Sequence, residues 1–232
     1  METTPPKITP KIKILVVFHT AGGKTLELAR AVEEGLTAAE VEVLFRRVPE
    51  TLSDERLKSW GIFDIQKYKD RVKDIELVKN EELLEADAII FGAPVISSMI
   101  SPQMNEFING LVEFWVESKL QGKPVALFGT ASNQNGGVDS TFLSFISSIL
   151  CHGMLFVGFP PDFQKHNEKY DELHGVSPYG VISATGFGER SPSDFDKEAV
   201  KYHANFVAKV SASLKAGQFA TKSKGSTDET AQ

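Results

Sequence analysis

The stretch Ile12-Lys-Ile-Leu-Val-Val-Phe-His-Thr-Ala-Gly-Gly-Lys-Thr25 guides the interpretation of the rest of the chain. Its apolar run, Ile14 to Phe18, is followed by a short turn and then by apolar residues at helical spacing from Leu26 to Leu36. This order predicts a strand, a tight loop and a helix. Because the strand is apolar on both faces, it is typical of a central parallel strand that helices cover on two sides.

The loop of this stretch lies at a predicted helix N-terminus, where free backbone N–H groups and the helix dipole favour a phosphate. A P-loop would need a glycine where Phe18 stands, and the G-x-G-x-x-G fingerprint of dinucleotide sites is absent. One interpretation is that hydroxyls and backbone amides wrap a single terminal phosphate, as flavodoxin-like proteins hold FMN. The other is an ordinary turn that uses glycine for its tight geometry. The candidate phosphate contacts are Thr20, Ala21, Gly22, Gly23, Lys24 and Thr25.

Composition limits the function classes. The chain has 232 residues, of which 41% are hydrophobic and 24% charged, so it can bury a full core as one domain, expected over residues 11–215. The formal net charge is -6, and no dense basic cluster occurs, which argues against nucleic-acid binding. The single cysteine, Cys151, cannot form an intramolecular disulfide, and its apolar neighbours predict a buried residue in an intracellular protein.

The two ends of the chain differ from its centre. Residues 1–10 contain three prolines and no apolar segment, which predicts a flexible N-terminus and no secretory signal. No segment reaches the run of about 18 apolar residues that a transmembrane helix requires. Residues 216–232 are mostly polar and are expected to form a disordered tail. These features together predict a cytoplasmic protein.

Further strands are predicted at 41–48, 88–91, 125–128 and 154–157, and a final helix at 194–214. Strands that alternate with helices predict an α/β fold, with an open parallel sheet of five strands and helices on both faces. A long irregular excursion is expected over 158–188. The polar segment 50–82, which contains Trp60, Ile62, Phe63, Ile65 and Tyr68, is expected to pack, with another subunit as one candidate partner.

Loops rich in Gly, Ser, Thr and Asn follow the first, third and fourth predicted strands. In an open parallel sheet, ligands bind beyond the carboxyl ends of the strands. The three loops are therefore expected to converge on one ligand, with each loop holding a different part of it.

With those loops placed, the chain resembles the tryptophan-repressor-binding-protein (WrbA-like) family of flavodoxin-like NAD(P)H:quinone oxidoreductases, from about Lys13 to Leu214. The motifs that carry the resemblance are Ala29-Arg-Ala-Val-Glu-Glu-Gly35, Arg47-Val-Pro-Glu-Thr51, Asp87-Ala-Ile-Ile-Phe-Gly-Ala-Pro94, Ser101-Pro-Gln-Met104, His152-Gly-Met154, Ser177-Pro-Tyr-Gly180 and Arg190-Ser-Pro-Ser193.

The resemblance implies a flavodoxin-like fold with FMN at the rim of each subunit and NAD(P)H as the reductant. It implies a ping-pong cycle in which a quinone, or another aromatic small molecule, takes two electrons from the reduced flavin. It also implies a homo-oligomer, a dimer or a tetramer. No metal is expected, because His166 and His174 match no recognised ligand spacing.

Residue by residue, the resemblance places flavin contacts in the second and third loops. The family follows its Gly-Thr-Pro with Thr-Arg-Phe-Gly-Asn, where this chain has Val95-Ile-Ser-Ser-Met99. The third loop keeps its hydroxyls and its glycine pair but carries additional amide side chains. The candidate flavin contacts are Pro94, Val95, Ile96, Ser97, Ser98, Thr130, Ala131, Ser132, Asn133, Gly136 and Gly137.

Two candidate catalytic residues also come from the resemblance. His152 matches a family position near the quinone pocket, where an imidazole can donate a proton to the developing hydroquinone; alternatively, it only ends the preceding helix. Tyr179 matches a residue that closes the same pocket, or it is a turn aromatic that covers the core.

The altered second loop motivates an alternative function. The chain would then be a flavodoxin-fold paralogue with weak or lost FMN binding. It would act as a binding or regulatory protein, or as a flavin-independent enzyme on an aromatic or quinone-like metabolite.

Overall fold

A computed structural model describes residues 11–59, 64–163, 175–186 and 188–225. Its centre is β1 (Lys13–Phe18), which the opening stretch predicted. Ile14, Val16 and Phe18 pack into the core on one face of the sheet, and Leu15 and Val17 pack into the core on the other. Both faces of β1 are therefore buried, as expected of a central parallel strand.

The sheet has the strand order β2-β1-β3-β5-β8-β7, with β4 paired to β3 and β6 paired to β5. Strands β1, β2, β3, β5 and β8 run parallel, whereas β4 and β7 are antiparallel to their partners. The predicted fold class is confirmed, although the strand count differs from five. The further strands are β2 (Glu42–Arg47), β3 (Ala88–Ile96), β4 (Met99–Ile100), β5 (Pro124–Ala131), β6 (Leu155–Phe156), β7 (Val176–Ser177) and β8 (Gly180–Ala184).

The fifth parallel strand is divided, which the sequence did not reveal. β6 pairs with the first residues of β5 and has only two residues, instead of the predicted strand 154–157. β8 pairs with the last residues of β5 and lies inside the segment expected to be irregular. The reason is that residues 157–179 separate the two halves of the strand, so neither half shows a long apolar run.

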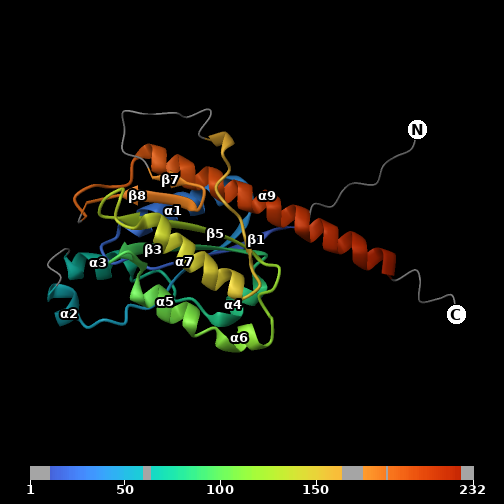
Figure 1. Ribbon diagram of the computed structural model, residues 1–232, viewed down its shortest axis with the longest axis horizontal. Helices are drawn as coiled ribbons and strands as arrows, with labels where there is room; N and C mark the ends of the chain where they lie inside the picture. The colour runs from blue at the N-terminus through green and yellow to red at the C-terminus, as the bar shows by residue number, and fades with distance from the viewer. Residues whose placement is uncertain (1–10, 60–63, 164–174, 187, 226–232) are drawn as a thin grey trace.

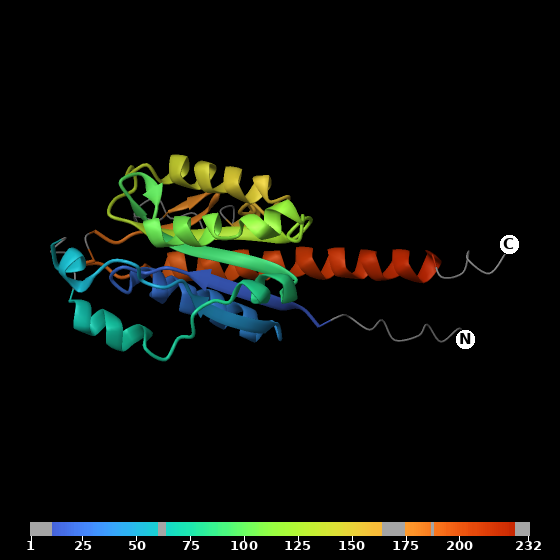
Figure 2. The ribbon, with the colours of Figure 1, turned by 90° about the horizontal axis from the view of Figure 1, so that it is seen from below.

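Helices cover both faces of the sheet, as predicted (Figure 2). α1 (Lys24–Ala38) and α9 (Asp194–Gly225) contribute to the core beneath one face. The opposite core takes residues from α4 (Asn80–Glu85), α5 (Pro102–Asn109), α6 (Val112–Val116) and α7 (Val138–Cys151).

α9 is longer than predicted. It runs to Gly225 rather than ending at Leu214, and it extends past the sheet in Figure 1. The backbone of residues 216–225 is therefore helical, which differs from the disordered tail expected there. Residues 226–232 and 1–10 lie outside the described residues, so the expectations for them stay predictions.

The segment 50–82 contains α2 (Asp54–Ser59), α3 (Ile65–Val72) and the start of α4. Ile65 and Tyr68 are buried, so the expectation that the segment packs is confirmed for them, and the surface that covers them belongs to their own chain rather than to the candidate second subunit. Trp60, Ile62 and Phe63 lie outside the described residues, as do His166 and His174.

Two findings bear on the expectations for Cys151 and for the membrane. Cys151 is exposed at the end of α7, whereas its apolar neighbours predicted burial. The reason is that it falls on the solvent side of an amphipathic helix whose other face carries Phe142, Phe145 and Ile149. Among the described residues, no helix is both long and apolar enough to cross a bilayer.

Candidate cofactor site

A cavity of about 490 Å³ lies at the carboxyl ends of the parallel strands. It takes residues from all three loops that were expected to converge, and also from α3 and from the loop after β8. Its lining residues are Ala21, Gly22, Lys24, Thr25, Asp64, Lys67, Tyr68, Arg71, Pro94, Val95, Ile96, Ser97, Thr130, Ala131, Ser132, Thr185, Gly186 and Gly188.

The first loop is folded by its own hydrogen bonds. The N–H of Gly23 donates to Oγ1 of Thr20 at 3.0 Å, and Gly23 takes a φ of 90° as the N-cap of α1. Thr20 and Gly23 therefore shape the loop and do not line the cavity. Thr25 does line it, and its hydroxyl lies 2.9 Å from the Thr130 hydroxyl, which links the first loop to the third.

The second loop is a β-hairpin, which the sequence did not predict. Val95 pairs with Ile100 and Ile96 with Met99, and the turn residues Ser97 and Ser98 have φ values of 50° and 58°. Both turn residues are thus left-handed, the geometry of a type I′ turn that usually selects Asn or Gly. A serine at position 98 consequently adopts a backbone conformation that glycine takes more readily.

Because of the hairpin, only some of the predicted flavin contacts of the second loop line the cavity. Pro94, Val95, Ile96 and Ser97 line the cavity, and their apolar atoms form a platform along it. Ser98 does not line the cavity, because its hydroxyl is directed to the carbonyl of Gly136, 3.4 Å away.

The third loop contributes only its first part. Thr130, Ala131 and Ser132 line the cavity, whereas Asn133, Gly136 and Gly137 do not. Gly137 is instead the N-cap of α7, with a φ of 74°, and its carbonyl accepts from the Thr141 hydroxyl at 2.7 Å.

Sequence reasoning missed two groups of lining residues. Asp64, Lys67, Tyr68 and Arg71 come from α3 and its N-cap, at the spacing i, i+3, i+4 and i+7 that places them on one helix face. That spacing is visible in the sequence and could have indicated the face. Thr185, Gly186 and Gly188 were missed because they follow β8, which was not predicted.

The ionisable residues of the cavity are mostly basic. Lys24, Lys67 and Arg71 line it together with one carboxylate, Asp64, which accepts a hydrogen bond from the N–H of Lys67 at 3.2 Å as the N-cap of α3. Burial, with a further contribution from the Glu50 charge, raises the pKa of Tyr68 to about 12, so its phenol is protonated at neutral pH.

His152 and Tyr179 do not line this cavity. His152 is the C-cap of α7, whose 14 residues separate it from the cavity rim by roughly 20 Å. Tyr179 lies in the turn before β8, at the opposite end of that strand from Thr185. Burial lowers the pKa of His152, and its buried Nδ1 has no hydrogen-bond partner among the described residues.

Comparison with known proteins identifies the family. The family model described as NADPH-dependent FMN reductase matches residues 10–159 of the chain. The chain belongs to the NADPH-dependent FMN reductase family.

Two curated relatives that cover most of the chain carry the same name. A protein from Geotalea daltonii named NAD(P)H dehydrogenase (quinone) is 38% identical over 207 residues, which cover 88% of this chain and 98% of the relative. A protein of the same name from Syntrophobacter fumaroxidans is 38% identical over 205 residues, covering 88% and 98%. The resemblance seen in the sequence is confirmed by these matches.

Solved structures agree on the fold. A WrbA-like flavodoxin from Agrobacterium tumefaciens aligns with a TM-score of 0.58 and 22% identity, covering 87% of this chain and 98% of the other. A flavodoxin from the domain Archaea aligns with a TM-score of 0.55 and 20% identity, covering 86% and 99%. At this identity the likeness concerns the flavodoxin-like fold alone.

The residues of the family member's cavity fit FMN. Its volume of about 490 Å³ lies within the roughly 300–1,000 Å³ that small-molecule sites occupy. The free N–H groups at the start of α1 suit a phosphate, because the first turn of a helix has no internal acceptors for them. The same cavity is lined by the apolar side chains of Val95 and Ile96 and by the hydroxyl-bearing residues Ser132 and Thr185, which suits a flat ring with polar edges.

Proposed function

We propose that this protein is an FMN-dependent NAD(P)H:quinone oxidoreductase that reduces quinones by two electrons in a ping-pong cycle. The observation that carries the proposal is a cavity that combines a phosphate-binding helix N-terminus with an apolar platform. The name shared by its relatives, NAD(P)H dehydrogenase (quinone), supports the same reaction.

Bound FMN supplies the hydride chemistry of this reaction. The chain's own residues would bind and orient the FMN. The N-terminus of α1 and the paired hydroxyls of Thr25 and Thr130 would hold the phosphate end, and the Ser132 hydroxyl would direct a polar edge of the ring. Ile96 and Val95 would exclude water from one side of the ring, and the open side of the cavity would admit NAD(P)H and then the quinone.

The proposal includes a homo-oligomer, a dimer or a tetramer, in the cytoplasm. Large apolar side chains are exposed on the face formed by α6, α7 and β6, and Val116 has an exposed fraction of 70%. An oligomer would bury this surface. The exposed residues on this face are Val112, Trp115, Val116, Leu143, Leu150 and Leu155.

The oligomer also gives His152 and Tyr179 a route to catalysis. Because both lie far from the cavity of their own chain, they can serve as catalytic residues only in the cavity of another copy. A His152→Gln variant that stays oligomeric would then lose quinone turnover while keeping its FMN. Full quinone turnover in that variant would contradict a catalytic role for His152 and would favour the alternative that it only ends α7.

The test of the reaction is a steady-state assay of NADH and NADPH oxidation by benzoquinone, with FMN-loaded and FMN-free protein. The proposal predicts activity only with FMN, and parallel double-reciprocal lines when both substrates are varied. An FMN-loaded protein that oxidises neither nucleotide would overturn the proposal. It would favour the alternative of a binding protein, which the altered Val95–Met99 segment motivates.

A further inference from the structure

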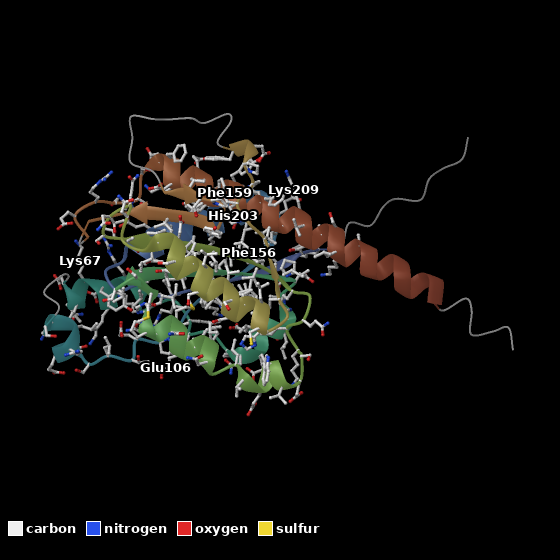
Figure 3. The ribbon with its side chains drawn as sticks, in the orientation of Figure 1. Lys67, Glu106, Phe156, Phe159, His203 and Lys209 are labelled. Atoms are coloured by element: carbon white, nitrogen blue, oxygen red, sulfur yellow. The ribbon has the colours of Figure 1, made fainter. Side chains whose placement is uncertain are left out.

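The helix α3 presents two cations to the cavity beside the first loop. Tyr68 and Val72 are buried against the domain and fix the orientation of this short helix. Lys67 and Arg71, four residues apart, both line the cavity. Figure 3 shows Lys67 on the side of the molecule where α3 lies. Two positive side chains are thus held on one helix face at the edge of the cavity.

The guanidinium of Arg71 lies directly over the first loop. Its Nη1 is 2.6 Å from the position that a Cβ on Gly23 would occupy, so a side chain there would displace the guanidinium, and the φ of 90° at this N-cap independently favours glycine. This is the same helix N-terminus that offers free N–H groups to an anion. The backbone donors and the guanidinium therefore border one small region.

Positive charge exceeds negative charge in that region. Glu27 is shared by two cations, because its Oε1 lies 3.2 Å from Lys24 Nζ and 3.7 Å from Arg71 Nη1. Lys67 forms no ion pair with any carboxylate of the described residues, and the one lining carboxylate, Asp64, caps α3. By contrast, Lys69 on the outer side of α3 pairs with Asp54 at 2.5 Å.

We propose that Lys67 and Arg71 bind the 5′-phosphate of FMN and form a cationic clamp on the flank of the first loop. The inference rests on the FMN site proposed above. A phosphate monoester carries close to two negative charges at neutral pH, and a guanidinium binds it through paired hydrogen bonds. The first loop itself offers backbone donors, the Thr25 hydroxyl and Lys24, whose ammonium is paired with Glu27. The clamp adds positive charge to this phosphate end, in a cavity whose second loop lacks the family's side chains.

The test compares FMN with riboflavin, which has the same ring but lacks the phosphate. Both flavins are titrated into FMN-free protein, with quenching of flavin fluorescence as the readout. Because Arg71→Met removes charge-assisted hydrogen bonds to the phosphate, it is expected to weaken FMN binding about ten- to hundredfold. Lys67→Met is expected to weaken it less, because a lysine binds as a point charge. Riboflavin affinity should stay within about twofold of the wild type.

Two control variants separate the clamp from net charge and from folding. Lys73→Met removes the same charge from an exposed position next to α3 that does not line the cavity, and FMN affinity should be unchanged. Arg71→Lys keeps the charge and should recover part of the lost affinity. The FMN affinity of the wild type should also fall with added salt, and this fall should be smaller in Arg71→Met.

The outcomes are distinct. If wild-type protein binds no FMN, the FMN site fails and the clamp fails with it. If the wild type binds FMN but Arg71→Met weakens FMN and riboflavin equally, or weakens neither, the clamp alone is overturned. The clamp is also overturned if the variants change only the binding of NADP⁺ relative to NAD⁺, because the cations would then recognise the 2′-phosphate of the reductant.

Discussion

The first loop, Thr20–Thr25, and the hairpin Val95–Ile100 border the same cavity but are built in opposite ways. In the first loop Thr20, Gly23 and Thr25 are buried, and the loop is held by hydrogen bonds to itself and to Thr130. The hairpin has an exposed turn with two left-handed serines. The phosphate end of the site therefore depends on a fixed backbone. At the ring end, the side chains of the hairpin can differ while the sheet that carries it stays the same.

The core between the sheet and α9 contains a buried histidine, His203, whose titration is expected to change stability more than any of the substitutions below, so the two loops are best compared at a pH above its titration range. His203 is buried and lies 3.0 Å from the Val157 carbonyl, with its ring beside Phe159 (Figure 3). Burial lowers its pKa to about 4, although hydrogen bonds to the Val157 and Gly158 backbone oppose this shift. The unfolded chain therefore binds the proton more readily between pH 6.5 and 4, and stability falls as the pH falls through this window.

The loss approaches about 3 kcal/mol at the acid end of the window, at about 1.36 kcal/mol per pKa unit. Urea unfolding between about pH 7.5 and about pH 4.5 measures it. The His203→Gln variant, which keeps a hydrogen-bond donor without this titration, should show a flatter dependence on pH. An equal slope in variant and wild type would remove His203 as the cause.

A second prediction tests the fixed backbone of the first loop. Thr25→Val leaves the buried Thr130 hydroxyl without its partner, which is expected to cost about 2 kcal/mol of unfolding free energy. It also removes a hydroxyl from the phosphate end, so FMN should bind more weakly. In the double variant Thr25→Val/Thr130→Val, stability should largely return, because no polar atom is left unpaired, while FMN stays weakly bound. A double variant that is as unstable as the single one would contradict this explanation.

A third prediction addresses the side chains of the hairpin. Replacing Val95-Ile-Ser-Ser-Met99 with the family's Thr-Arg-Phe-Gly-Asn should raise FMN affinity by about tenfold, which is about 1.4 kcal/mol. The expected gain comes from polar contacts to the ring, so riboflavin affinity should rise in parallel. Unchanged affinity for both flavins would show that the altered segment does not limit binding.

A smaller effect is expected from the strain of the turn alone. Ser98→Gly should stabilise the protein by about 1 kcal/mol, because glycine takes a φ of 58° without steric cost. Ser147→Gly is the matched control, since that exposed serine lies within α7 and should lose about 0.5–1 kcal/mol. Thermal unfolding of both variants measures the difference in sign. Destabilisation by Ser98→Gly would mean that the contact of its hydroxyl with Gly136 outweighs the strain.

Local sequence patterns predicted the elements of the fold that are formed by consecutive residues. The apolar run Ile14–Phe18 and the glycine turn after it indicated β1, the first loop and α1, and all three are present. The divided strand was not predictable in the same way, because β6 and β8 come together only through their shared partner β5. The hairpin was missed because Ser-Ser carries no signal for a type I′ turn.

Prediction of the candidate site was limited in the same way, because the sequence does not show which distant residues come together. Loops after strands were found, since their composition and position are both visible in the sequence. The α3 face was missed because Lys67 and Arg71 stand in a charged segment, and only the burial of Tyr68 shows which side of the helix meets the cavity. Spacing alone could have indicated a face, but not what that face contacts.

The assignment of this cavity to FMN can be checked with an absorption spectrum of the protein after incubation with FMN and gel filtration. We expect flavin bands that elute with the protein at close to one FMN per chain. A colourless protein after the same treatment would contradict the assignment.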